Sequence, residues 1–83
     1  MTLDRIKAGR RPYKSLGGIS GVRYFSLGPS SIYIWFKDDD GYEYNDVRPG
    51  PQHVATMKRL AEEGRGLATY INQHVRENYA RKL

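Results

Sequence analysis

The sequence predicts an α+β fold: a small antiparallel three-stranded β-meander followed by two α-helices packed on one face. Two patterns carry this prediction. β-Branched and aromatic residues separated by turn sequences fill positions 22–47, and apolar residues recur at helical spacing after position 51. Because the chain has 83 residues and no cysteine, we expect one small domain held together by packing alone.

Residues 1–20 are predicted to form a flexible basic N-terminal arm, and residues 21–83 the folded domain. Between Lys7 and Gly21 the chain has few apolar residues and several glycines. Ordering such a segment costs backbone entropy and buries little apolar surface in return. We therefore expect the arm to be mobile in the free protein.

The three strands are expected at about residues 22–27, 31–37 and 42–47. Turn residues separate them, first Gly28-Pro29-Ser30-Ser31 and then Asp38-Asp39-Asp40-Gly41. Short connections of this kind join antiparallel neighbours, which gives the meander.

Two registers are open for the second hairpin. A two-residue turn ending at Gly41 puts Tyr42 and Tyr44 on the face of Trp35, where they widen an aromatic platform. A three-residue loop pairs Tyr44 with Phe36 and places both tyrosines on the opposite face, in the core. The second register gives a more continuous apolar face, and we favour it.

Two helices are expected after the sheet. The first covers residues 51–63, because Pro51 suits a first helical turn and Gly64 suits the position after the last one. The second begins after Gly66 and ends with Arg81 and Lys82 in its last turns. Its apolar residues recur at every fourth position: Leu67, Ile71, Val75 and Tyr79.

The net charge of +5 is concentrated at the two ends of the chain. Residues 1–23 hold six basic side chains against one acid, whereas residues 24–50 carry a net charge of −3. Basic side chains placed on phosphates release condensed counterions, so this pattern is typical of nucleic-acid binders. The candidate phosphate contacts are Arg5, Lys7, Arg10, Arg11, Lys14, Lys37, Arg59, Arg65 and Arg76.

Most of the ten aromatic residues fall in the predicted strands. A small sheet that bears aromatic side chains beside cations can stack single-stranded nucleic acid. Tyr33 and Trp35, on one face of the second strand, are the candidate stacking residues. Core packing accounts for aromatic strand residues equally well, because tyrosine and tryptophan are good strand formers.

The sequence gives no pattern for catalysis or for a metal site. Asp38, Asp39 and Asp40 are consecutive, whereas calcium loops alternate their ligands. His53 and His74 lack the spacing of a zinc site, and no serine or threonine lies in a nucleophile motif. We expect a non-enzymatic protein with no cofactor and no metal.

Three segments together resemble the KTSC domain, a short module named after the C-terminus of some lysyl-tRNA synthetases. They are Ile32-x-Ile34-x-Phe36, then Gly41-Tyr42-Glu43-Tyr44 with Val47, and a closing stretch from Asn72 to Tyr79. The resemblance implies a stand-alone bacterial or phage protein of unknown function, for which RNA binding has been suggested. It marks five motif residues: Tyr42, Tyr44, Asn72, Arg76 and Tyr79.

The leading hypothesis is therefore a small nucleic-acid-binding module, for RNA above all, that uses the basic arm and the aromatic sheet. The alternative is a protein-interaction domain that self-associates through the edge of its first or third strand or binds an acidic partner protein. The sequence shows neither a membrane span nor a secretory signal, so we expect a cytoplasmic protein without membrane contact. Its oligomeric state is left open.

Overall fold

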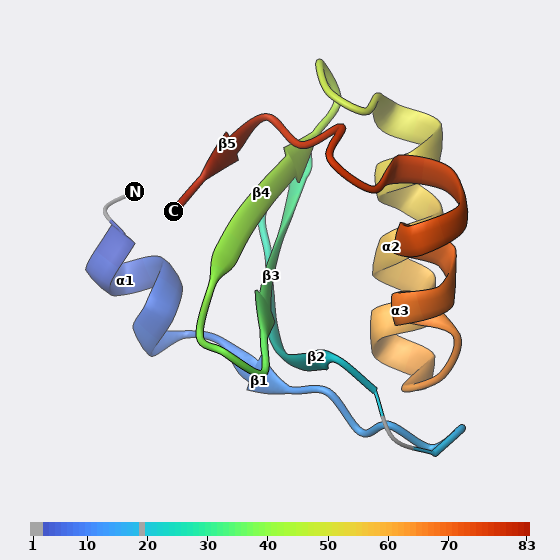
Figure 1. Cartoon of the computed structure of the whole chain (residues 1–83). Coiled ribbons are helices and arrows are strands. Elements are labelled where there is room, and N and C mark those ends of the chain that lie inside the picture. The colour runs from blue at the N-terminus through green and yellow to red at the C-terminus, as the bar shows by residue number, and fades with distance from the viewer. Residues whose placement is uncertain (1–2, 19) are drawn as a thin grey trace.

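The computed structural model describes residues 3–18 and 20–83, and it shows an α+β fold built on one antiparallel sheet. Five strands follow each other in the order β1-β2-β3-β4-β5. Two longer helical segments cover one face of the sheet, and a short N-terminal helix lies against the other (Figure 1). Along the chain the elements are α1 (Leu3–Ala8), β1 (Arg11–Pro12), β2 (Val22–Leu27), β3 (Ser31–Phe36), β4 (Gly41–Asn45), α2 (Pro51–Glu63), α3 (Leu67–Tyr70), the π-helical turn η1 (Ile71–Val75) and β5 (Arg81–Lys82).

The predicted α+β class is confirmed, and the predicted meander forms the middle of the sheet as β2, β3 and β4. The prediction of only three strands was wrong, because the two-residue strands β1 and β5 add one neighbour on each side. Such short strands have no periodicity that a sequence pattern could reveal. They also occupy part of the two edges that were expected to be open for strand addition, so the strands now at the edge of the sheet are very short.

The hairpin between β3 and β4 has the predicted face and a different register. Tyr44 pairs with Ile32 and Tyr42 with Ile34, so both tyrosines share the face of the isoleucines. Pairing of Tyr44 with Phe36 was wrong by four positions, because the chain turns earlier, at Asp39, which is left-handed (φ 67°), rather than at Gly41. Since side chains alternate with a period of two, a shift of four positions preserves the face.

Helix α2 matches the prediction and ends as expected at Gly64, which is left-handed (φ 78°). The predicted second helix does not reach the C-terminus. It passes from α3 into η1 and ends at Val75, where Arg76 takes an unusual backbone conformation (φ 37°, ψ −109°). Tyr79 therefore lies in a loop rather than on a helix, and Arg81 belongs to strand β5 rather than to a last helical turn.

The N-terminal segment lies against the sheet, unlike the mobile arm that the sequence predicts. Tyr13 is only 7% exposed, and its hydroxyl oxygen accepts a hydrogen bond from the backbone N–H of Leu67 at 3.2 Å. The Leu16 N–H donates to the carbonyl of Gly64 at 2.6 Å. A few contacts of this kind hold a mostly polar segment against the rest of the domain. Residues 1, 2 and 19 of the predicted arm lie outside the described residues.

The buried apolar residues form two groups, one on each face of the sheet. The smaller group covers the outer face, where Ile6 of α1 packs on Tyr33 and Trp35 with Leu83 beside them. The larger group fills the space between the inner face and the helices: Tyr13, Val22, Phe25, Ile32, Ile34, Tyr44, Val54, Met57, Ala61, Leu67, Ile71 and Val75.

Candidate functional site

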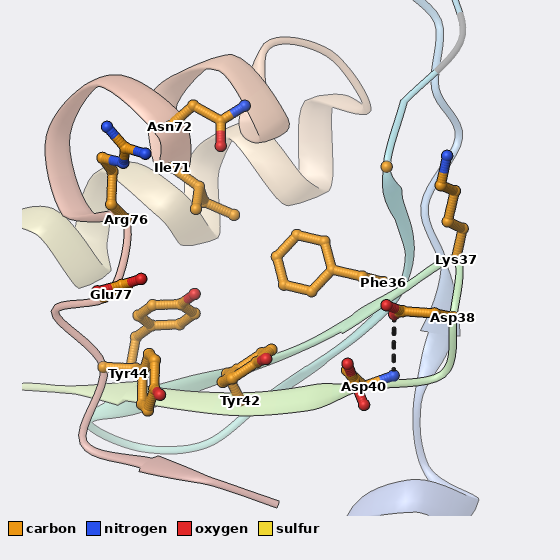
Figure 2. A pocket seen from close by; sticks show the side chains of 12 residues that line it. Phe36, Lys37, Asp38, Asp40, Tyr42, Tyr44, Ile71, Asn72, Arg76 and Glu77 are labelled. Atoms are coloured by element: carbon orange, nitrogen blue, oxygen red, sulfur yellow. Dashed lines mark hydrogen bonds between the residues drawn. The ribbon is translucent and has the colours of Figure 1, made fainter.

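A cleft of about 440 Å³ opens where the β3–β4 hairpin faces the end of the helical layer (Figure 2). Phe36 and Tyr42 lie on its sheet side, and Asn72 and Arg76 lie on its helical side. We call it the tyrosine cleft. Its lining residues are Gly21, Phe36, Lys37, Asp38, Asp40, Tyr42, Tyr44, Ile71, Asn72, Arg76, Glu77 and Tyr79.

The aromatic rings of the tyrosine cleft are packed against one another. The ring centroids of Tyr42 and Tyr79 lie 4.7 Å apart, and those of Phe36 and Tyr42 lie 5.8 Å apart with an edge-to-face geometry. Tyr44 meets Tyr79 edge to face at 6.4 Å and is almost fully buried. Burial raises the pKa of the Tyr44 phenol well above its ordinary value, so this hydroxyl stays protonated and neutral.

Charges of both signs surround these rings. Lys37 and Arg76 are exposed cations, and Asp38 and Glu77 are exposed carboxylates. Asp40 lies 3.9 Å from the ammonium of Lys82, and its backbone N–H donates to the Asp38 carboxylate at 3.3 Å (Figure 2). The cleft therefore has little excess charge.

A second cleft of about 600 Å³ adjoins the tyrosine cleft, and the two share Phe36 and Lys37. We call it the Arg23 cleft. The register between β2 and β3 shifts between Val22 and Tyr24, which makes Arg23 an extra residue without a partner on β3. Bulges of this kind redirect a side chain. The Arg23 cleft is lined by Pro12, Tyr13, Ser15, Ser20, Arg23, Tyr24, Phe36, Lys37 and Asp39.

A third, smaller cleft of about 90 Å³ continues from the second through Tyr13, Ser15 and Ser20 and ends at Arg65. The three clefts are neighbours through their shared lining residues, and we call the three together the furrow. Lys14 lies outside the furrow, in a separate cleft that it lines together with Arg11 and Glu62.

The cations of the chain divide into paired and unpaired groups. On the N-terminal segment, Lys7 and Arg10 form ion pairs with Asp39 at 3.5 and 3.3 Å, and Arg11 pairs with Glu62 at 3.2 Å. Among the residues that the structure describes, five cations have no ion pair, side-chain hydrogen bond or ring contact: Lys14, Arg23, Lys37, Arg65 and Arg76.

Several predicted phosphate contacts are engaged elsewhere. Arg10 lies over the ring of Tyr24 at 4.2 Å, and Arg11 lies over Phe25 at 4.7 Å. Arg59 pairs with Glu63 on α2, and Arg5 also makes an interaction. These four side chains do not line the furrow.

The predicted stacking platform is absent from the outer face. Trp35 is 3% exposed and Tyr33 is 9% exposed, because Ile6 and Leu83 cover them. No sequence pattern indicated this cover, since α1 is too short to show a helical pattern. The rings of Phe36 and Tyr42, on the opposite face of the sheet, do reach a cleft.

By contrast, the structure brings together the five residues marked by the KTSC resemblance. Tyr42, Tyr44, Asn72, Arg76 and Tyr79 come from two distant parts of the chain, and all five line the tyrosine cleft. Sequence reasoning missed Arg23, for which the only signal was an arginine beside a tyrosine in a strand. It also missed Ser15 and Ser20, which carry no pattern of their own.

The histidine and acidic side chains of the described residues do not form a metal site. Within residues 3–18 and 20–83, no group of three or more histidine, cysteine or acidic side chains is arranged to hold a metal ion. His53 instead bonds to the Tyr70 hydroxyl through Nδ1 at 2.6 Å, and His74 stacks on the same tyrosine. In that same part of the chain, each helix is too short or too polar to cross a membrane.

Comparison with models of protein families, with curated proteins and with solved structures gives no match. The KTSC resemblance therefore stays a prediction.

Proposed function

We propose that this protein is a non-enzymatic module that binds single-stranded nucleic acid, RNA above all, along the furrow. One observation carries the proposal: four of the five unpaired cations in the described part of the chain line these three neighbouring clefts. Arg65 lies at one end, Arg23 and Lys37 in the middle, and Arg76 at the other end. An unpaired cation is free to neutralise a phosphate and release its counterion.

The surroundings of these cations suit a polynucleotide backbone. The only carboxylate that lines the Arg23 cleft is that of Asp39, which is already neutralised by Lys7 and Arg10. Hydroxyls of Ser15 and Ser20 lie in the same cleft, as does the ring of Tyr24, one side of which Arg10 covers. Phosphate oxygens accept hydrogen bonds from such hydroxyls, and bases stack on such rings.

Strand addition at a sheet edge, the alternative from the sequence, receives less support. Edge strand β1 consists of Arg11 and Pro12, and edge strand β5 consists of Arg81 and Lys82. Short edges with charged residues and proline oppose pairing with another chain. We therefore favour the furrow over the sheet edges as the binding surface.

The test is a titration of labelled single-stranded RNA at several salt concentrations. Three phosphate contacts, at Arg65, Arg23 and Lys37, predict that the logarithm of the affinity falls with the logarithm of salt concentration with a slope of roughly −2. Lys37→Gln lowers the affinity and makes this slope shallower by about 0.7. The matched control is Arg59→Gln, which removes the same charge outside the furrow.

Two results would contradict the proposal. One is the absence of binding at low salt, or an affinity that salt does not change. The other is an equal loss of affinity for Lys37→Gln and Arg59→Gln, since this would mean that net charge alone attracts the RNA.

A further inference from the structure

We infer that the tyrosine cleft is a pocket for a single unstacked nucleobase, while the Arg23 cleft holds the adjoining phosphates. This inference rests on the proposed function and assigns different parts of the nucleic acid to different clefts of the furrow. The two clefts differ in the charges and in the aromatic rings that line them.

The tyrosine cleft is poorly suited to a phosphate. Its two cations, Lys37 and Arg76, share the cleft with carboxylates of Asp38, Asp40 and Glu77. An anion that entered would meet three like charges, only one of which is partly neutralised, by a lysine at 3.9 Å. A ligand without net charge meets no such repulsion.

The walls of the cleft suit a flat, neutral ring. Phe36, Tyr42 and Tyr79 are each half-buried, so their rings are held by packing and still reach the cleft. Bases stack on such side chains regardless of base type. The volume of about 440 Å³ lies within the range of pockets that hold small molecules, about 300–1,000 Å³.

The rim can satisfy the polar edge of a base. Asn72 offers an amide donor and a carbonyl acceptor, Arg76 offers only donors, and Asp38 and Glu77 offer only acceptors. Nucleobase edges carry donors and acceptors side by side, so a rim with both kinds of group matches them. A rim that carried only cations would offer donors and no acceptors, so it would not match a base edge.

The two clefts are joined in a way that fits one continuous strand. Lys37 lines both of them, so a phosphate next to the inserted base reaches an ammonium group. Arg23 then lies in the adjoining cleft for the next phosphate. Base and backbone of one strand can therefore occupy neighbouring clefts together.

NMR titrations with nucleosides and with inorganic phosphate separate the two clefts. Adenosine, cytidine, guanosine and uridine carry no phosphate, and we expect them to shift the signals of Tyr42, Asn72 and Tyr79. Inorganic phosphate should shift those of Arg23 and Lys37 instead. Nucleosides that leave the tyrosine cleft unshifted would overturn the inference.

RNA binding by variants gives a second, independent test. Phe36→Leu keeps an apolar side chain and removes a ring, so we expect about tenfold weaker RNA binding with an unchanged salt slope. Lys37→Gln changes the slope, as described above. The matched control is Tyr70→Leu, which removes a half-buried ring outside the furrow and should leave the affinity unchanged.

Asn72→Ala tests the rim without a risk to folding, because this side chain is exposed. It should narrow the differences in affinity among the four nucleosides. Native-like Phe36→Leu and Asn72→Ala proteins with unchanged RNA affinity and unchanged base preference would refute the base pocket and leave the proposed function standing. Nucleoside shifts in a protein that fails to bind RNA would refute the proposed function and support the pocket.

Discussion

Replacing Ile6 by alanine tests whether the N-terminal segment is part of the folded domain. Ile6 is 1% exposed and packs on Tyr33 and Trp35, on the face of the sheet away from the main core. Removing most of a buried isoleucine costs about 2–3 kcal/mol when the surroundings collapse in part. A domain of this size has about 4–12 kcal/mol in total, so the loss is large.

The consequence should be local as well as global. A six-residue helix is not stable by itself, so α1 depends on its contacts with the sheet. Without Ile6, the ties that remain on this segment include the exposed pairs of Lys7 and Arg10 with Asp39, and exposed pairs contribute little. We expect α1 to detach and expose Trp35.

Tryptophan fluorescence measures this directly, because Trp35 is the only tryptophan of the chain. In Ile6→Ala the emission of the folded protein should shift to longer wavelength, and the melting temperature followed by circular dichroism should fall by roughly 10–20 °C. Ile71→Ala is the control, since it weakens the opposite face and leaves Trp35 covered in the folded state. Unchanged emission and melting temperature in Ile6→Ala would refute the docking of α1 and restore the mobile arm.

Three further predictions address the rest of the fold. Ile71→Ala should lower the free energy of unfolding by about 2–4 kcal/mol, measured by urea denaturation, and an unchanged midpoint would contradict its burial in the main core. Gly64→Ala should cost about 1–3 kcal/mol in the same assay, because its φ of 78° disfavours a side chain and the new Cβ lies 2.8 Å from that of Lys14; a neutral result would show that this turn rearranges freely. The hydrogen bond from Arg10 holds the pKa of Asp39 below its ordinary value of 3.8, so Asp39 stabilises the fold above that pH and the effect is lost as pH falls through its folded-state pKa. Calorimetry from pH 7 to pH 2.5 should therefore show the melting temperatures of wild type and Asp39→Asn converging in acid, and a constant difference would count against the ion pairs.

The parts of the fold that the sequence predicted are those with local signals. Turn residues bound the strands β2, β3 and β4, and Pro51 and Gly64 bound α2, as the sequence indicates. Each of these signals acts within a few residues, through a fixed φ, a missing N–H or a left-handed turn. No longer-range information is needed to recognise them.

The parts that sequence reasoning missed depend on contacts between distant residues. Strand β1 exists because residues Arg11 and Pro12 pair with β2, and α1 exists because Ile6 packs on Trp35. Neither segment has a pattern of its own. The same contacts cover Tyr33 and Trp35, the two rings that were expected to stack bases.

The candidate site follows from the early end of the last helix. Apolar residues at every fourth position predicted a helix through Tyr79, but the chain turns at Arg76 after one π-helical turn. The loop then carries Tyr79 onto Tyr42, with a centroid distance of 4.7 Å, and β5 pairs with β4 beyond it. The tyrosine cleft lies between this loop, the last helical turn and strands β3 and β4. A non-glycine residue with positive φ costs free energy, which the surrounding packing must offset. The unusual backbone at Arg76 thus ends the helix and places an unpaired cation at the rim of the cleft, so one local feature of the chain shapes both the fold and the proposed binding surface.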